Sequence, residues 1–259
     1  MKKLTFLTAI LLALPMIGFG QNVSIPDPNF KAYLVGNSAI NTNGDNQIQV
    51  SEASAFNGTI NVNNLNINSL IGIEAFVSLN ALYCVNNVIT NLDLSGCTSL
   101  TFLGLSSNSA LTSLDVSGCT ALTSLDCIYN QSLTNLDLSA CTALTYLMCQ
   151  YTQLTSLDVR NGNNTNLTEF YSSNNPNLTC INVDDATWST ANWTVANGNI
   201  DSQHYFSNNC SGTSSIQELN TNKKLLKVTD LLGRETKATN QVLIHIYDDG
   251  TLEKKIVFE

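Results

Sequence analysis

Apolar and polar positions alternate in a fixed rhythm along the middle of the chain. Four consecutive blocks of eleven residues follow the template Leu-x-x-Leu-x-Leu-x-x-(Asn/Cys), beginning at Leu100, Leu111, Leu122 and Leu133. The last two apolar positions of each block are separated by one polar position. This two-residue period is typical of an extended strand with one buried side. No block can bury its apolar row alone, so the repeat predicts a solenoid whose stacked coils share one core.

The rhythm extends over ten blocks of two alternating types between Leu79 and Val183. One block of each type makes a coil of 21 to 23 residues, a length typical of leucine-rich repeats. A blocks open at Leu79, Leu100, Leu122, Leu144 and Leu167, and B blocks open at Ile89, Leu111, Leu133, Leu154 and Leu178. The chain therefore resembles leucine-rich-repeat proteins. The expected fold class is mainly β, a solenoid at residues 76–184 with a small helical N-terminal cap and a small C-terminal β-unit.

The eight cysteines would suggest four disulfides in a secreted chain, but their places in the repeat indicate otherwise. Six of them occupy inward strand or bend positions, where cysteine serves as a small apolar residue. We expect these six to be buried free thiols: Cys84, Cys97, Cys119, Cys127, Cys141 and Cys149. Cys180 occupies an outward position of the last block, and Cys210 lies beyond the repeats. A Cys180–Cys210 disulfide is therefore predicted to close the C-terminal cap at residues 185–214.

Residues 1–20 have the pattern of a secretory signal peptide. Lys2 and Lys3 precede an apolar run, and Gly18 and Gly20 suit a cleavage site before Gln21. No other run is long and apolar enough to cross a bilayer. The expected location is extracellular or on the outer cell surface.

The N-terminal cap, residues 21–75, contains a segment that resembles an EF-hand calcium loop between two short helices. The segment runs from Asn41 to Glu52, and Glu52 would close the site with both carboxylate oxygens. Asn41 replaces the usual first aspartate and Asn46 the usual glycine, so calcium is a candidate cofactor of weak affinity. The alternative is a polar turn that binds no ion. The expected ligands are Asn41, Asn43, Asp45, Gln47 and Glu52.

Charge is scarce, with 12% of residues charged, and it is one-sided. Between Lys31 and Lys223 there are thirteen acidic residues and one basic residue, Arg160, which gives 1 − 13 = −12. Nucleic-acid partners need clustered Lys and Arg, so this class of function is excluded. An anionic membrane surface is disfavoured for the same reason.

The tail, residues 215–259, is different in composition and carries most of the basic residues. Alternation over 242–247, a turn at 248–250 and the run from Lys255 to Phe258 predict a small antiparallel β-unit. The motifs at Asp230–Arg234 and Tyr247–Thr251 resemble the C-terminal sorting domain of type IX secretion substrates in the Bacteroidetes. The resemblance implies the type IX secretion machinery as a partner. The alternative is a β-module without a role in export.

The two block types differ in their outward residues. B blocks are monotonous and carry an aspartate ladder (Asp93, Asp115, Asp137, Asp158), whereas A blocks vary and contain aromatic residues. Aromatic side chains supply much of the energy of protein interfaces, so we expect an adhesin-like binding protein that recognises a protein or a glycan through the A face. The expected contacts are Tyr83, Phe102, Ile128, Tyr129, Tyr146, Met148 and Tyr171.

No catalytic constellation emerges, and no catalytic residue or enzyme activity is predicted. Two alternatives remain open. Threonine follows the leading residue of nine blocks from Thr90 to Thr179, which would suit an ice- or crystal-binding surface. Paired carboxylates of the aspartate ladder would suit a polysaccharide hydrolase, although the regular ladder offers no apolar pocket to raise one pKa.

Overall fold

The computed structural model describes residues 20–210 and three strands of the tail, at 225–229, 242–247 and 252–256. The signal-peptide segment and the tail motifs at 230–234 and 248–251 lie outside the described residues. By its contacts the chain divides into two compact units, residues 1–210 and residues 211–259. In the described parts of both units, no helix is long and apolar enough to cross a membrane.

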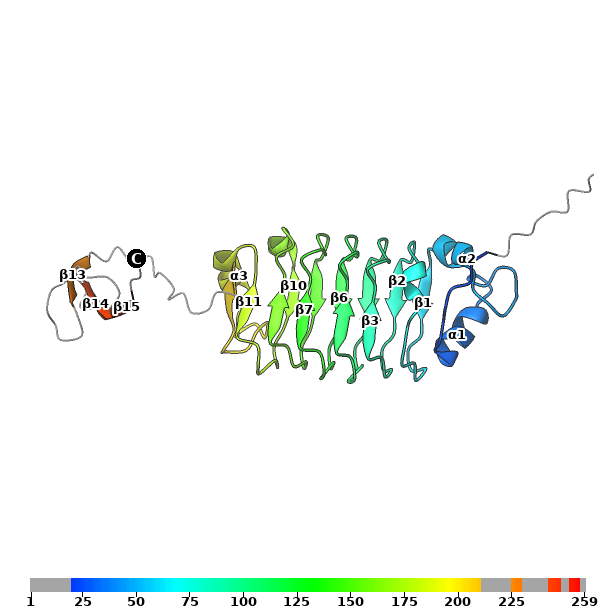
Figure 1. Ribbon diagram of the computed structural model, residues 1–259, viewed down its shortest axis with the longest axis horizontal. Helices are drawn as coiled ribbons and strands as arrows, with labels where there is room; N and C mark the ends of the chain where they lie inside the picture. The colour runs from blue at the N-terminus through cyan, green and yellow to red at the C-terminus, as the bar shows by residue number, and fades with distance from the viewer. Residues whose placement is uncertain (1–19, 211–224, 230–241, 248–251, 257–259) are drawn as a thin grey trace, which may run out of the picture. The chain divides into compact units, whose positions relative to one another are not determined.

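Short parallel strands stack coil upon coil in the first unit, as Figure 1 shows. The strands of the A blocks form one continuous parallel sheet, the A sheet. β1 belongs to a coil that precedes the ten blocks, where Ile60 and Val62 take the places of the leucines. In spatial order the A sheet comprises β1 (Thr59–Asn61), β2 (Ala81–Tyr83), β4 (Phe102–Gly104), β6 (Ser124–Asp126), β8 (Tyr146–Met148) and β10 (Glu169–Tyr171).

The strands of the B blocks lie on the other side of each coil, which we name the B side. They form two separate parallel sheets, β3 with β5 and β7 with β9, β11 and β12. Their bounds are Asn91–Asp93 (β3), Ser113–Asp115 (β5), Asn135–Asp137 (β7), Ser156–Asp158 (β9), Cys180–Asn182 (β11) and Tyr205–Ser207 (β12). The predicted solenoid with one strand in each half-coil is therefore confirmed.

The inward leucines form one continuous column. Leu103 and Leu125 of the A sheet are fully buried and pair in register with their neighbours, and Leu136 on the B side is 2% exposed. Leu114 in β5 is the exception, since it is only partly buried. Burying a leucine side chain contributes about 1.5–3 kcal/mol, so the column is the main source of stability in this unit.

Asparagines at the A bends tie each coil to its neighbour. Asn108 is fully buried and its side-chain amide donates to the carbonyls of Leu105 and Cys84, 2.8 and 3.0 Å away. Its own backbone N–H donates to Oδ1 of Asn130 in the next coil, at 3.0 Å. These contacts satisfy the polar groups of a sharp bend inside the core. They explain why asparagine recurs at this position, which only the block opening at Leu144 fills with another residue, Thr152.

The six cysteines at inward positions are buried free thiols, as the repeat register predicted. At the B bends, Sγ of Cys97 and Sγ of Cys119 lie 3.4 and 3.3 Å from a carbonyl of the preceding coil. Burial raises the pKa of Cys84 and Cys149 to about 12. A thiol must ionise before it attacks a reagent, so these groups are chemically inert in the folded protein.

We therefore expect the native protein to leave a thiol reagent such as dithionitrobenzoate unreacted. In strong denaturant without reductant the same assay should count six thiols, the number of free cysteines. Rapid reaction of even one thiol in the native protein would contradict this picture of sealed coils. A Leu125→Ala variant provides a positive control, because loosened coils expose the thiols more often.

Two short helices and a loop close the first coil. α1 (Pro28–Val35) begins at Asp27, whose Oδ1 accepts the N–H groups of Asn29 and Phe30. Its Oδ2 accepts the N–H groups of Asn68 and Ser69, so a single carboxylate joins α1 to the first coil. α2 (Val50–Ala55) follows the loop, and a 3₁₀ turn, η1 (Ile73–Ala75), completes the cap.

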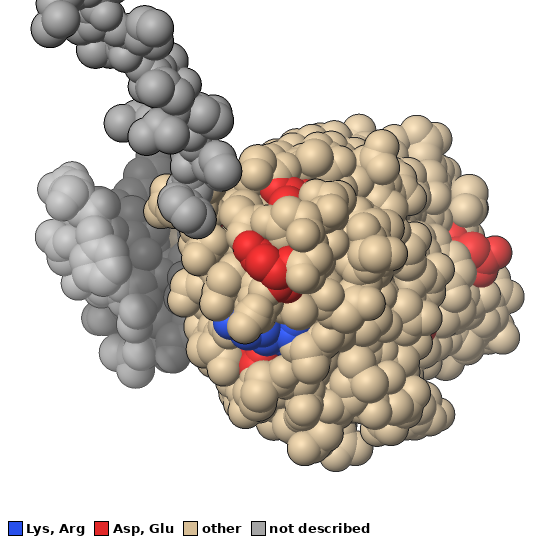
Figure 2. Space-filling view, turned by 90° about the vertical axis from the view of Figure 1, so that its right-hand side faces the viewer, with Lys and Arg blue, Asp and Glu red and all other residues tan. Residues whose placement is uncertain are grey.

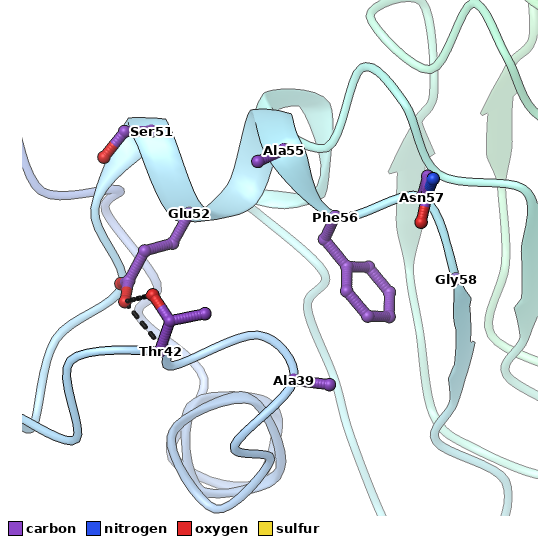
Figure 3. Close-up of a pocket in the computed structure, with 8 residues that line it drawn as sticks. All are labelled: Ala39, Thr42, Ser51, Glu52, Ala55, Phe56, Asn57 and Gly58. Atoms are coloured by element: carbon purple, nitrogen blue, oxygen red, sulfur yellow. Dashed lines mark hydrogen bonds between the residues drawn. The ribbon is translucent and has the colours of Figure 1, made fainter.

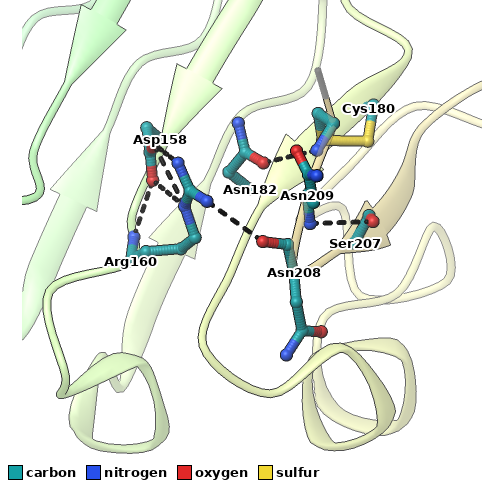
Figure 4. The surroundings of a disulfide bond; sticks show 8 residues. Asp158, Arg160, Cys180, Asn182, Ser207, Asn208 and Asn209 are labelled. Atoms are coloured by element: carbon teal, nitrogen blue, oxygen red, sulfur yellow. Dashed lines mark hydrogen bonds and ion pairs between the residues drawn. A yellow bond between two sulfur atoms is a disulfide. The ribbon is translucent and has the colours of Figure 1, made fainter. Parts of the chain in front are cut away.

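The last coil is sealed by aromatic residues and a disulfide. The helix α3 (Ala186–Asn192) is followed by Trp193, which is 3% exposed and stacks on Phe170 at 4.2 Å between ring centroids. The predicted disulfide between Cys180 and Cys210 is present. Figure 4 shows it beside Arg160, whose guanidinium pairs with Asp158 and donates to the carbonyl of Asn208 at 3.0 Å. A second 3₁₀ turn, η2 (Asn164–Asn166), packs against α3.

The second unit contains a three-stranded antiparallel sheet in the order β13-β14-β15. The strands are β13 (Leu225–Thr229), β14 (Val242–Tyr247) and β15 (Leu252–Ile256). The antiparallel pairing agrees with the expected β-unit, but β15 begins three residues earlier than the run at 255–258 suggested. Its pairing with β14 extends through Lys254 and Glu253 to Leu252, because ladder bonds involve the backbone whatever the side chain.

Candidate functional site

The outward face of the A sheet presents two straight rows of side chains fixed by strand register. Outward residues of neighbouring strands stand directly opposite each other, for example Phe102 opposite Ser124 and Asp126 opposite Met148. One row contains Ala81, Phe102, Ser124, Tyr146 and Glu169, and the other contains Tyr83, Gly104, Asp126, Met148 and Tyr171. Neighbouring residues of a row are about 4.8 Å apart, the spacing of hydrogen-bonded strands. The face is therefore rigid before any partner arrives.

An aromatic pair occupies the first coils of this face. The rings of Tyr83 and Phe102 stack at 4.6 Å between centroids. Gly104 follows in the same position as Tyr83 one coil later, and a Cβ there would lie 3.1 Å from Cε1 of Phe102. The missing side chain thus leaves room for the Phe102 ring over the strand.

A tyrosine between two carboxylates marks the centre of the face. The hydroxyl of Tyr146 donates to Sδ of Met148 at 2.9 Å, and the hydroxyl of Tyr171 donates to Glu169 at 3.0 Å. Burial, with further contributions from Asp126 and Glu169, raises the pKa of Tyr146. The hydrogen bond to Glu169 raises the pKa of Tyr171. Both tyrosines therefore remain neutral hydroxyl groups at physiological pH.

A second aromatic pair lies at the adjoining A bend. Tyr129 and Tyr151 stack at 4.7 Å and are 48% and 44% exposed. Both have left-handed backbone conformations, with φ of +60° and +56°, which bulky residues rarely adopt. Asn86 and Asn174 occupy the same bend position in other coils with similar φ values. Two large side chains are thus held in strained positions and exposed to solvent.

The structure brings all seven predicted contact residues to one side of the solenoid. Tyr83, Phe102, Tyr146, Met148 and Tyr171 lie on the A sheet, while Ile128 and Tyr129 lie at the adjoining bend. Tyr151 is absent from the predicted contacts, although it stands 22 residues after Tyr129 in the repeat. That spacing was the signal that could have found it. Whether these residues contact a partner stays a prediction.

The calcium-like loop is closed by hydrogen bonds from its own backbone. Oε1 of Glu52 accepts the N–H groups of Thr42 and Asn43 at 2.8 and 3.2 Å, and Oε2 accepts the N–H of Gln49 at 3.0 Å. Asp45 accepts the N–H of Gln47 at 2.7 Å. The two carboxylates of the loop therefore accept hydrogen bonds from the backbone of the loop itself. One oxygen remains without a partner, the buried Oδ1 of Asn41.

A cavity of about 520 Å³ adjoins this loop, and Figure 3 shows its lining. Glu52 and Thr42 form one wall, and the ring of Phe56 lies at the end of α2. Among the described residues no group of three or more His, Cys, Asp or Glu side chains is placed to hold a metal ion. The loop thus offers fewer charged ligands than calcium sites generally supply.

The carboxylates of the N-terminal cap should make this region acid-labile. Burial acts to raise the pKa of Asp27 and of Glu52, but backbone hydrogen bonds outweigh burial and hold both pKa values below the ordinary 3.8 and 4.5. A depressed pKa stabilises the folded state above the ordinary value, and this contribution is lost as the pH falls toward the folded pKa. We expect thermal stability to decrease below about pH 4, with a smaller decrease in Asp27→Asn. An identical pH profile in both proteins would contradict this assignment.

The outward hydroxyls and carboxylates of the B side are occupied by local contacts. Oγ1 of Thr112 and of Thr155 donates to a carbonyl of the preceding coil at 3.1 and 3.2 Å. Oδ1 of Asp93 accepts both the N–H and the hydroxyl of Ser95, two residues further on. These contacts stabilise the coils and explain why threonine and aspartate recur.

Charged side chains are few on the described surface. In the end view of Figure 2 they form separate spots on an otherwise uncharged surface. The ion pair of Arg160 with Asp158 lies at the end of β9. On the outward side of the A sheet, neither Asp126 nor Glu169 forms a salt bridge within the described residues.

The sequence was compared with families and solved structures. A model of the leucine-rich-repeat domain of the endo-beta-N-acetylglucosaminidase EndoS matches residues 45–175, just over half of the 259 residues. No curated protein matches the chain.

Similar solved structures include three proteins of Listeria monocytogenes. The functional domain of InlJ, which includes a cysteine ladder, is 20% identical over 82% of this chain and 50% of its own length, with a TM-score of 0.43. This chain thus spans half the length of that domain. The internalin InlF is 19% identical over 70% of this chain and 68% of its own, with a TM-score of 0.35. The internalin C2 is 20% identical over 66% of this chain and 93% of its own, with a TM-score of 0.34.

Proposed function

This chain belongs to the family of the EndoS leucine-rich-repeat domain, and we propose that it is a non-catalytic binding module that recognises a partner protein through the A face. The A face means the outward side of the A sheet together with the bend at Ile128, Tyr129 and Tyr151. The observation that carries the proposal is the position of the aromatic residues within the ten blocks. Half-buried and exposed rings lie on this side, whereas the outward positions of the B strands from β3 to β9 carry serine, asparagine and aspartate.

The side chains of the A face are ordered before a partner binds, which lowers the entropic cost of binding. Binding normally costs about 0.5–1.5 kcal/mol for each flexible side chain that becomes ordered. On the A face the rings of Tyr83 and Phe102 already stack, and Tyr146 is held by Met148. A partner therefore meets surfaces that are already ordered. Rigid aromatic residues of this kind are the typical hot spots of interfaces.

The proposal is tested with an array of extracellular proteins and glycans probed with the full chain and with Tyr146→Ala. We expect the variant to lose at least about tenfold in affinity for the partner, in the range of a hot-spot truncation. Tyr205→Ala is the matched control, because Tyr205 is 50% exposed in β12 on the B side. Equal signals from the parent and Tyr146→Ala would rule out the A face as the recognition surface. Binding only to glycans would replace the proposed protein partner by a glycan.

We also propose export to the cell surface or the medium, supported by the apolar segment at residues 1–20 and by the motifs at 230–234 and 247–251 of the tail. The tail would direct passage through the type IX machinery. Deleting residues 215–259 should leave the protein inside the cells of a host that has this machinery. Unchanged amounts of the truncated protein in the medium would contradict the role of the tail.

Calcium binding at Asn41–Glu52 stays a prediction. The unpartnered Oδ1 of Asn41 supports it, and the hydrogen bonds of Glu52 oppose it because they would have to break. Calorimetric titration of calcium should give weak heat in the parent and none in Glu52→Gln. The absence of heat in the parent would end the prediction, and equal heat in both proteins would move the ion elsewhere.

A further inference from the structure

The B side has a gap between β5 and β7. Every other pair of consecutive B strands from β3 to β12 is hydrogen-bonded, but β5 and β7 belong to different sheets. In the neighbouring coils the N–H of Leu94 donates to the carbonyl of Asp115, and the N–H of Leu138 to the carbonyl of Asp158, both at 2.8 Å. The equivalent N–H of Val116, a buried residue, has no acceptor among the residues that the structure describes. Unpaired buried N–H groups are rare in folded proteins.

The bend that follows β7 differs from the two preceding B bends by one methyl group. The B bends read Ser-Gly-Cys at Gly96 and at Gly118, but Ser-Ala-Cys at Ala140. A Cβ built at Gly96 would lie 2.4 Å from the carbonyl oxygen of Glu74, and one built at Gly118 would lie 1.8 Å from that of Ser95. The coil that contains Ala140 cannot approach its neighbour this closely.

Two further observations agree with a displaced coil. Sγ of Cys141 lies 3.9 Å from the carbonyl oxygen of Val116, whereas Cys119 makes the same contact at 3.3 Å. Leu114, at the gap, is the partly buried leucine of the B side. The A sheet remains hydrogen-bonded from β4 to β8. The separation is therefore local to the B side.

The gap contains a cavity of about 300 Å³. Its lining combines the apolar Leu114 and Val116 with the carboxylates of Asp115 and Asp137. Oδ1 of each aspartate accepts an N–H of its own turn at 2.9 Å, and Oδ2 of each has no hydrogen-bond partner among the described residues. Arg160, the basic residue nearest in sequence to these two aspartates, forms its ion pair with Asp158 instead.

We propose that the gap opened by Ala140 between β5 and β7 is a recess for one arginine side chain of a partner protein. The aliphatic stem packs on the accessible part of Leu114, and the guanidinium donates to Oδ2 of Asp115 and of Asp137. Arginine fits better than lysine because its planar group carries five donors in a fixed arrangement, enough to reach both carboxylates. The recess lies on the B side and does not depend on the A face.

The test uses the isotope-labelled full chain and the blocked peptide acetyl-Gly-Arg-Gly-amide in an NMR titration. We expect shifts at the amides of Val116 and Thr134, and at least a tenfold weaker affinity in Asp137→Asn. Asp93→Asn is the matched control, because Asp93 has the same place in the ladder but lies where β3 and β5 are paired. It should bind within twofold of the parent. A peptide with Gln in place of Arg should cause no shifts.

The Ala140→Gly variant tests the shape of the recess independently of its charge, because it keeps both aspartates. It should close the gap, slow hydrogen exchange at Val116 and Thr134, and weaken peptide binding at least tenfold with both aspartates in place. Unchanged exchange in Ala140→Gly would overturn the role of the methyl group. Absence of shifts in the parent, equal binding by the lysine peptide, or equal losses in Asp93→Asn and Asp137→Asn would overturn the arginine recess.

Discussion

Replacing Phe170 with alanine is expected to lower the free energy of unfolding of the solenoid by about 3–5 kcal/mol, the range for a buried phenylalanine. Phe170 is fully buried in β10, the last strand of the A sheet. Its ring stacks on Trp193 at 4.2 Å and lies 6.5 Å from the ring of Phe206. Removing it leaves a cavity between the last A strand and the C-terminal cap, where the next coil cannot compensate.

The measurement is a denaturant titration followed by tryptophan fluorescence. Both tryptophans of the chain, Trp188 and Trp193, pack in this cap, and their ring centroids are 5.5 Å apart. The fluorescence should therefore report the loosened cap directly. Tyr205→Ala, at a half-exposed position of the same region, should change the free energy by less than about 0.5 kcal/mol. A midpoint in Phe170→Ala equal to that of the parent would show that the cap is not anchored on this ring.

Gly118→Ala is expected to destabilise the solenoid by about 2–3 kcal/mol, at the upper end of the range for overpacked sites. The added methyl group would lie 1.8 Å from the carbonyl oxygen of Ser95, so the two coils must separate as they do at Ala140. Glycine-to-alanine changes without strain usually stabilise a protein by about 0.4–1 kcal/mol. The sign of the effect therefore distinguishes a steric contact from an ordinary change in chain entropy.

The accompanying structural change is measurable by hydrogen exchange. The N–H groups of Leu94 and Thr112 donate to the facing strands at 2.8 and 2.9 Å in the parent. In Gly118→Ala both should exchange faster, while the amide of Cys127 on the A sheet, which donates to Met148 at 2.8 Å, should be unaffected. Gly162→Ala is a suitable control for strain without overlap, since Gly162 has a φ of +74° and nothing within 4 Å of its Cβ position. A stabilised Gly118→Ala would contradict the proposed origin of the gap.

The repeat was predictable because its cause is local and periodic. The position of a leucine in the template, such as Leu103 or Leu125, indicates that it is buried, and ten copies of the pattern define the fold of the repeats. The disulfide followed from the same register, since Cys180 falls on an outward position. The face that carries the aromatic residues was also predictable, because alternation along each strand assigns every side chain to one side.

Other features depend on contacts between coils, which the pattern does not encode. The Gly-to-Ala change at Ala140 is visible in the sequence, but its effect requires the distance between two bends. The left-handed conformation of Tyr129 and Tyr151 could not be read from residues that normally avoid it. In the loop, the spacing from Asn41 to Glu52 suggested metal ligands, whereas the structure directs the Glu52 carboxylate to backbone N–H groups.

The sealed thiols have a consequence for how the chain matures. Eight cysteine thiols must yield one correct disulfide between Cys180 and Cys210, and any thiolate can attack a disulfide while the chain is unfolded. The coils must therefore fold before the cysteines are oxidised. Only folding buries the six other thiols and so removes them from thiol–disulfide exchange. Refolding should therefore succeed when the oxidant is added after collapse, and early oxidation should trap scrambled isomers.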